Sequence, residues 1–152
     1  MPELPEVETT RRGIAPYMEG KRLEQWVVRE PRLRWPVAPE WPALVAGQTV
    51  HALTRRSKYL VLHLDHGQLL AHLGMSGQFR IVPPGARLEK HDHSDWLMEG
   101  GALIRYRDPR RFGAMLYTDD WTQHPLITRL GPEPLSDDFH ADYLYAQLRQ
   151  RR

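Results

Sequence analysis

Cysteine is absent from the 152-residue sequence, which excludes both a disulfide framework and a thiolate metal site. No apolar stretch approaches the roughly 20 residues that a membrane-spanning helix requires. The N-terminus also lacks the basic region and the apolar core of a secretory signal. We therefore expect a cytoplasmic protein with no membrane contact, made of one domain or of one domain and part of another.

Excess charge is scarce as well, because 21 Lys and Arg residues against 19 Asp and Glu residues give a formal net charge of only +2. The arrangement of the positive charge says more than its total, since arginine supplies most of it and occurs in clusters. The clusters are Arg11 with Arg12, Arg32 with Arg34, Arg55 and Arg56 with Lys58, and the segments 105–111 and 149–152. Arginine suits bidentate contacts with phosphate, so nucleic acid is a candidate partner, although a solvated surface produces similar clusters.

The sequence predicts a helix from about Pro5 to Tyr17. Pro5 suits the first helical position, and carboxylates in the first turn precede arginines further along, an order that the helix dipole favours. The apolar residues that fall roughly on one face are Val7, Ile14 and Met18. We expect the helix to end at Gly20.

The centre of the sequence consists of short, often alternating apolar runs bounded by turn residues. The runs are LEQWVVRE, QTVHALTRRS, KYLVLHLDHG, QLLAHLGMSGQFRIV, SDWLMEGG and ALIRYRDPRRFGAMLYT. Asp65-His66-Gly67 predicts the bend of a hairpin. Together with the N-terminal helix, six or more strands at this spacing predict an α+β fold built on a β-sandwich or barrel. The proline-rich segment EPRLRWPVAPEWPAL is expected to connect strands and to end in a short helix.

After about Thr122 the sequence has helical signals again. A Ser136-Asp137-Asp138 cap precedes apolar residues at helical spacing, namely Phe139, Tyr143, Leu144 and Leu148. We therefore expect a β-sandwich domain over residues 1–122 and the start of a helical domain over residues 123–152.

The opening MPELPEVE places a proline directly after the initiator methionine, with Glu3 and Glu6 close behind. Removal of Met1 would expose the secondary amine of Pro2. An α-amino group titrates near pKa ~8, against ~10.4 for lysine, so a useful fraction is neutral and nucleophilic at pH 7. Such an amine can attack an aldehyde-level carbon to form an iminium ion, with Glu3 and Glu6 as proton donor and acceptor. The simpler interpretation is that these carboxylates only stabilise the start of a helix.

Six segments, in one order along the chain, resemble the formamidopyrimidine-DNA glycosylase family. They are PELPEVET at the start, RRSKYL at 55–60, HLGMSG at 72–77, KHDH at 90–93, DPRRFG at 108–113 and LGPEPLSDDF at 130–139. A PELPEV start, rather than PEGPE, favours the formamidopyrimidine branch over the sister endonuclease VIII group. The resemblance implies an N-terminal β-sandwich flanked by helices, followed by the start of a truncated helix-two-turn-helix domain.

The activity implied by this resemblance is bifunctional base-excision repair of double-stranded DNA in the bacterial cytoplasm, at the nucleoid. The enzymes of this family excise 8-oxoguanine and formamidopyrimidines, then nick the abasic site by β- and δ-elimination. Carried over by position, Pro2 is the Schiff-base nucleophile on the sugar C1′, Glu3 is the proton donor, and Glu6 is a positioning carboxylate. Lys58 matches the lysine credited with proton donation during β-elimination and with phosphate contact. This chemistry requires no metal or diffusible cofactor.

The resemblance also implies how DNA is held. A lesion must leave the base stack to reach such a site, so the protein must fill the gap. Met75, Arg110 and Phe112 match the side chains that do this, and their apolar and cationic chemistry suits the task. His91 and Arg110 match phosphate or DNA-binding positions, and Arg151 aligns with a further basic contact.

Simpler interpretations exist for several of these residues. On spacing alone, Met75 and Phe112 suit a hydrophobic core. His91 and His93 lie two residues apart, which on a strand puts both on one face, as in a metal site with no apparent third ligand. Arg105, Arg107 and Arg111 suit a solvated or sheet-facing charge run.

The sequence departs from the family at its C-terminus. Family members continue through a helix-two-turn-helix and usually a four-cysteine zinc finger, so we expect no structural zinc here. Fewer phosphate contacts lower affinity without removing the chemistry, so we expect weak activity that is mainly that of a lyase. An apolar face near Leu126, Ile127, Leu130 and Tyr143 would favour self-association. The alternative function is a non-catalytic module that binds damaged DNA or a protein through the β-sandwich.

Overall fold

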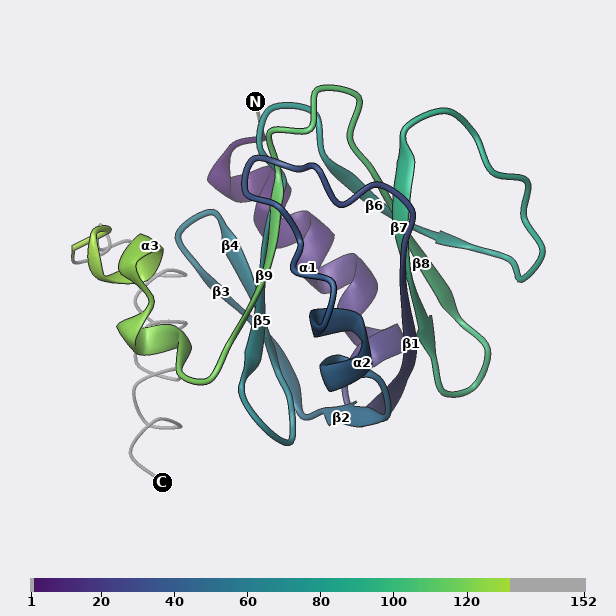
Figure 1. Ribbon diagram of the computed structural model, residues 1–152, viewed down its shortest axis with the longest axis horizontal. Helices are drawn as coiled ribbons and strands as arrows, with labels where there is room; N and C mark the ends of the chain where they lie inside the picture. The colour runs from purple at the N-terminus through teal and green to yellow at the C-terminus, as the bar shows by residue number, and fades with distance from the viewer. Residues whose placement is uncertain (1, 132–152) are drawn as a thin grey trace.

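The structure is a computed structural model, and it describes residues 2–131. Two antiparallel β-sheets form a sandwich, in the strand orders β2-β1-β7-β8-β6 and β3-β4-β5-β9 (Figure 1). The strands of the first sheet are β2 (Gln48–Val50), β1 (Lys21–Val28), β7 (Asp92–Met98), β8 (Leu103–Arg107) and β6 (Gln78–Val82). The strands of the second are β3 (Ala52–Arg56), β4 (Tyr59–His63), β5 (Gln68–His72) and β9 (Ala114–Thr118). The predicted α+β fold with a β-sandwich is confirmed.

The predicted N-terminal helix is α1 (Leu4–Met18), and its three expected apolar residues are buried in the core. It packs against β1 and β6 of one sheet and against β3 and β4 of the other, so it joins both layers (Figure 1). The chain turns at Gly20, whose φ of +79° suits glycine. The end of the helix is therefore also as predicted. Among the described residues, no helix is long and apolar enough to cross a membrane.

Two further local predictions are confirmed. The Asp65-His66-Gly67 bend joins β4 and β5, which pair from Tyr59 with His72 to His63 with Gln68. A Cβ on Gly67 would lie 2.5 Å from the carbonyl oxygen of Thr118, so the bend requires glycine. The proline-rich connection ends in the short helix α2 (Trp41–Val45).

The segment after β9 packs on the sandwich. It contains the 3₁₀ helix η1 (Trp121–Gln123) and the short helix α3 (Pro125–Thr128). Ile127 is 6% exposed and packs with Trp121, Tyr59 and Leu116 in a second apolar cluster. The expectation that Ile127 belongs to an exposed face is therefore wrong, because the four-stranded sheet covers it. Leu130 is exposed, whereas Tyr143 and the cap predicted at 136–138 lie outside the described residues.

Candidate functional site

A cavity of about 560 Å³ opens where α1 begins. The residues that line it are Pro2, Glu6, Thr10, Leu73, Met75, Ser76, Gly77, Gln78, Arg107 and Pro109. They come from the N-terminal segment with the start of α1, from two loops, and from the ends of β6 (Gln78) and β8 (Arg107) next to those loops. The loops are the Met75 loop (residues 73–77) and the Phe112 loop (residues 108–113). Figure 1 shows the start of α1 at the same end of the molecule as these loops. The fold therefore brings three of the sequence segments singled out above into one site.

The start of α1 positions the acidic residues. Glu3 is the N-cap residue, and its carbonyl oxygen accepts hydrogen bonds from the amides of Glu6 and Val7, both at 3.0 Å. Its carboxylate caps no amide and lies 3.5 Å from the ammonium of Lys58. The role of a helix cap therefore does not account for the Glu3 side chain, which is 68% exposed.

Lys58 stands in the two-residue turn between β3 and β4, where Arg56 pairs with Tyr59. The preceding residue, Ser57, has a φ of +54°, an uncommon value for a residue with a side chain. Arg55 donates a hydrogen bond to the carbonyl oxygen of Ser57 at 3.1 Å, which holds this turn. The turn directs Lys58 toward the N-terminus of α1, as its contact with Glu3 shows.

Glu8 connects α1 to this turn. Its carboxylate accepts hydrogen bonds from Arg11 and Arg12 on the same helix and from the buried Arg55 of β3 at 3.1 Å. Burial alone would raise the pKa of Glu8, but the arginines outweigh it and lower the pKa to about 2. Glu8 is therefore an anion at neutral pH. It ties the helix that follows Pro2 and Glu3 to the hairpin that carries Lys58.

The two loops at the cavity touch each other through their backbones. A Cβ on Gly74 would lie 2.4 Å from the carbonyl carbon of Phe112, and one on Gly113 would lie 2.6 Å from the carbonyl oxygen of His72. Met75 and Phe112 are each 42% exposed, so the core interpretation of both is wrong. The guanidinium carbon of Arg110 lies 5.3 Å from the centre of the Phe112 ring, within the range of a cation–π contact.

The buried side chain of Asp108 holds the Phe112 loop in place through hydrogen bonds. It is fully buried, and its carboxylate accepts hydrogen bonds from the hydroxyls of Ser76 and Tyr106, both at 2.7 Å. The amides of Arg111 and Gly113 donate to it at 3.1 and 2.9 Å. Four donors thus hold a buried carboxylate, and burial next to that carboxylate raises the pKa of Tyr106.

The two histidines of KHDH have different environments. His93 is buried in β7, and its Nε2 lies 2.7 Å from the carbonyl oxygen of Asp108. His91 precedes the strand with a φ of +73°, so the expectation that both rings share one strand face is wrong. Desolvation and the positive charge of Lys90 lower the pKa of His91. Within residues 2–131, no group of three or more His, Asp or Glu side chains could hold a metal ion.

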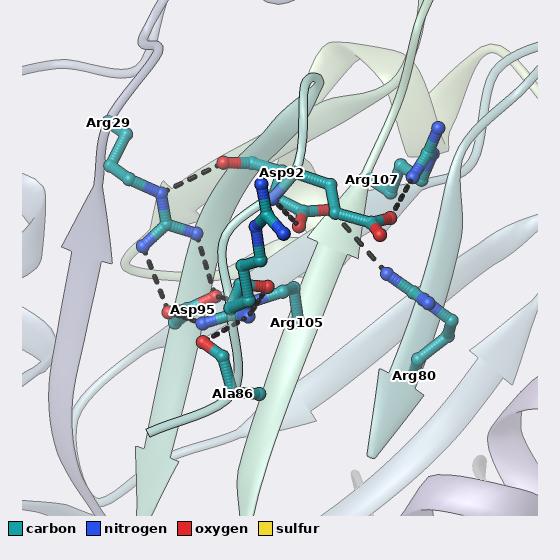
Figure 2. Close-up of polar contacts among 9 residues, drawn as sticks. Arg29, Arg80, Ala86, Asp92, Asp95, Arg105 and Arg107 are labelled. Carbon is teal, nitrogen blue, oxygen red and sulfur yellow. Dashed lines mark hydrogen bonds and ion pairs between the residues drawn. The ribbon is translucent and has the colours of Figure 1, made fainter. Parts of the chain in front are cut away.

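An ion-pair network on β7 and β8 anchors the segment that leads to His91 (Figure 2). Asp95 accepts paired hydrogen bonds from Arg29, at 2.8 and 2.9 Å, and from the buried Arg105, at 2.9 and 3.0 Å. Arg105 also donates to the carbonyl oxygen of Ala86 at 3.3 Å. Of the two alternatives for Arg105, the solvated one is wrong, because the side chain is buried and faces the sheet, where it pairs with Asp95 of the neighbouring strand.

Several of the site residues predicted from the sequence lie close together in the structure. Pro2, Glu6 and Met75 line one cavity, and Arg110 and Phe112 extend from the adjoining loop. Arg151 lies outside the described residues.

Sequence reasoning assigned no role to Ser76 or Asp108, and no part in the site to Glu8 or Arg107. The Asp-Pro pair in DPRRFG was a usable signal, because Asp and Pro open a β-turn. The amide of Arg111 donates to the carbonyl oxygen of Asp108 at 3.2 Å and closes such a turn.

Comparisons with known proteins identify the family of the chain. Residues 1–115 match the model of the formamidopyrimidine-DNA glycosylase N-terminal domain. Over the full chain, the sequence is 56% identical to the formamidopyrimidine-DNA glycosylase of Hahella chejuensis and 51% identical to that of Pasteurella multocida. In both cases the chain spans 56% of the relative's length.

Solved structures give the same result. The Lactococcus lactis formamidopyrimidine-DNA glycosylase, bound non-covalently to DNA containing an AP site, is similar with a TM-score of 0.77 and 30% identity. The match covers 98% of this chain and 58% of that one. A complex between the inhibited enzyme from the same organism and DNA containing an N7-benzyl formamidopyrimidine lesion gives a TM-score of 0.74 at 31% identity. That match covers 84% of this chain and 48% of the other.

Proposed function

Because the chain belongs to the formamidopyrimidine-DNA glycosylase family, we propose that it acts on double-stranded DNA at abasic sites and oxidised purines, with Pro2 as nucleophile. The observation that carries this proposal is the convergence of Pro2 and Glu6 on one cavity, with Glu3 and Lys58 paired beside it. Removal of Met1 frees the Pro2 nitrogen.

The first step is attack of the Pro2 nitrogen on the sugar C1′. A C–N bond forms, the glycosidic bond breaks, and the base leaves with the bonding electrons. At an abasic site the same nitrogen adds to the C1′ aldehyde, and water leaves. Glu3 donates a proton to the ring oxygen as the sugar opens, which produces the iminium ion. Glu6, on the first turn of α1, holds the sugar against the nucleophile.

The second step breaks the DNA strand. The iminium ion acidifies the C2′ proton, and loss of this proton expels the 3′ phosphate in a β-elimination. Lys58 supports this step by proton donation and by contact with the phosphate. The pairing of Lys58 with Glu3 at 3.5 Å fits such a role, because it places an ammonium next to the residue that follows the nucleophile.

DNA binding involves the exposed loops. Met75, Arg110 and Phe112 fill the gap that the everted nucleotide leaves, and their exposure supports this role. His91 and Arg151 contact backbone phosphates, which orients the duplex without reading its sequence.

The activity that we propose for this chain is narrower than that of its relatives, because the chain spans 56% of their length. We assign it lyase action at abasic sites, where no base need be recognised, and weaker excision of oxidised purines. It needs no metal for these steps, and it acts in the bacterial cytoplasm, at the nucleoid.

The test is borohydride trapping on a duplex with a single abasic site at low salt. We expect a covalent adduct that maps to Pro2 and falls at least ~10-fold in Pro2→Gly. Pro84→Gly, in an exposed loop, is the matched control and should keep the adduct. Protein shown by mass spectrometry to retain Met1 should give none. If the wild type binds the duplex and forms no adduct, the chain is a damaged-DNA-binding module and the enzyme assignment fails.

A further inference from the structure

The hydroxyl of Ser76 joins the two loops that carry the exposed DNA-facing side chains. It donates a hydrogen bond to Asp108 at 2.7 Å and accepts one from the amide of Arg110 at 3.0 Å. We propose that Ser76 is a positioning residue whose hydroxyl makes Met75, Arg110 and Phe112 enter damaged DNA as one unit. This inference rests on the proposed function.

The backbone geometry makes such coupling effective. The close approach of Gly74 to Phe112 leaves no room for a side chain between the two loops. In the Met75 loop, the amide of Gly77 donates to the carbonyl oxygen of Leu73 at 2.7 Å, which fixes its turn. Each loop is therefore internally closed, and Ser76 adds a side-chain link that fixes one loop relative to the other.

The direction of the two Ser76 hydrogen bonds is set by Asp108. Its carboxylate is an acceptor, so the serine proton points to it and leaves a lone pair for the Arg110 amide. Asp108 is itself tied to the core by the Tyr106 hydroxyl. A chain of hydrogen bonds thus runs from the core to the backbone that carries the Arg110 side chain.

Loss of the Ser76 hydroxyl should affect function more than folding. The Asp108 oxygen would keep its bond from the Arg111 amide at 3.1 Å. The amide of Arg110 belongs to an exposed residue and can bond to water instead. What disappears is the fixed placement of two loops, which must then be ordered when DNA binds.

The experiment compares affinity for two duplexes, one with a tetrahydrofuran abasic analogue and one undamaged, at fixed salt. In Ser76→Ala, the ratio of the two affinities should fall ~10-fold, while binding to undamaged DNA stays within ~2-fold. A 2-aminopurine placed opposite the abasic analogue should report weaker gap filling by its fluorescence. Ser76→Thr, which keeps a hydroxyl, should restore the ratio.

Ser94→Ala is the matched control, because it removes a buried serine hydroxyl that bonds to the sulfur of Met115 and makes no hydrogen bond to Asp108 or to the amide of Arg110. It should leave the ratio unchanged. The inference is overturned if Ser76→Ala keeps the ratio, weakens both duplexes equally, or lowers Tm more than Ser94→Ala does. A wild type with no preference for the abasic duplex and no borohydride adduct would overturn the proposed function, and this inference with it. A wild-type preference that Ser76→Ala retains overturns the inference alone.

Discussion

The ammonium of Lys58 lies 3.5 Å from the carboxylate of Glu3, although the two residues belong to the β3–β4 turn and to the start of α1. A second contact fixes these two elements relative to each other, because Glu8 of the helix accepts a hydrogen bond from Arg55 of the hairpin. A cation is thereby kept next to the proposed nucleophile.

Replacement of Lys58 tests the role of this cation. In Lys58→Ala we expect single-turnover strand cleavage at an abasic site to slow ~100-fold, because the departing phosphate loses its proton donor. Borohydride trapping should decrease much less, since the nucleophile remains. Lys21→Ala, at the start of β1, is the matched control. Equal losses of trapping and of cleavage would contradict an elimination-specific role.

The acid stability of the fold should depend on Glu8. Its native pKa of about 2 lies below the ordinary value of 4.5, so the unfolded state binds the proton more readily than the native state. The resulting stability is present above pH 4.5 and is lost as the pH falls toward 2. In Glu8→Gln we expect a loss of ~1–2 kcal/mol at pH 7 and a flatter decline in acid.

Urea unfolding over a pH series measures this difference. Glu24→Gln, at an exposed position of β1, is the control and should follow the wild-type curve. A Glu8→Gln curve parallel to that of the wild type below pH 4.5 would show that the carboxylate does not carry the effect.

Two glycine-to-alanine changes should have opposite effects. A Cβ on Gly113 would lie 1.8 Å from the Tyr106 hydroxyl, whereas one on Gly13 of α1 would meet nothing within 4 Å. Gly113→Ala should therefore destabilise the protein by more than ~2 kcal/mol. Gly13→Ala should stabilise it by ~0.5–1 kcal/mol, because alanine favours helix. Thermal unfolding of the two variants measures both changes in stability. Changes of the same sign would contradict this prediction.

Replacing Phe112 or Phe79 by alanine should distinguish a side chain used for DNA binding from one used for stability. Phe112 is exposed, so Phe112→Ala should change the free energy of unfolding by less than ~0.5 kcal/mol. Its affinity for abasic DNA should still fall ~10-fold, because an apolar wedge is lost. Phe79, stacked on Trp96 with ring centres 4.8 Å apart, is the control. Phe79→Ala should cost ~3 kcal/mol in unfolding. A large stability loss in Phe112→Ala would argue against a free wedge.

Local chemistry made the helices and turns predictable. The apolar spacing and Gly20 defined α1, and Asp65-His66-Gly67 defined the β4–β5 bend, because each signal acts within a few residues. The same reasoning located the candidate site only through whole segments shared with a known family. It could not tell a loop wedge from a core residue at Met75, since both uses favour an apolar side chain.

What the sequence did not reveal depends on strand register, burial and backbone conformation. Arg105 is buried because β7 and β8 pair in a register that sets Asp95 opposite it, and charge spacing does not reveal strand register. His91 left the expected strand face through a backbone φ of +73°, which no side-chain pattern encodes. Asp108 escaped notice because the sequence does not show that this charged residue is buried beside an exposed loop, or that Ser76, 32 residues away, is one of its four donors.

The packing of α1 across both sheets also has a consequence for synthesis. Pro2 leaves the ribosome at the beginning of translation, yet the cavity beside it includes Arg107 and Pro109, which are more than 100 residues later in the sequence. A nascent chain that ends before β8 therefore carries Pro2 without these two residues of its cavity. The order of translation therefore completes the cavity at Pro2 only after β8 and the loop that follows it have been synthesised.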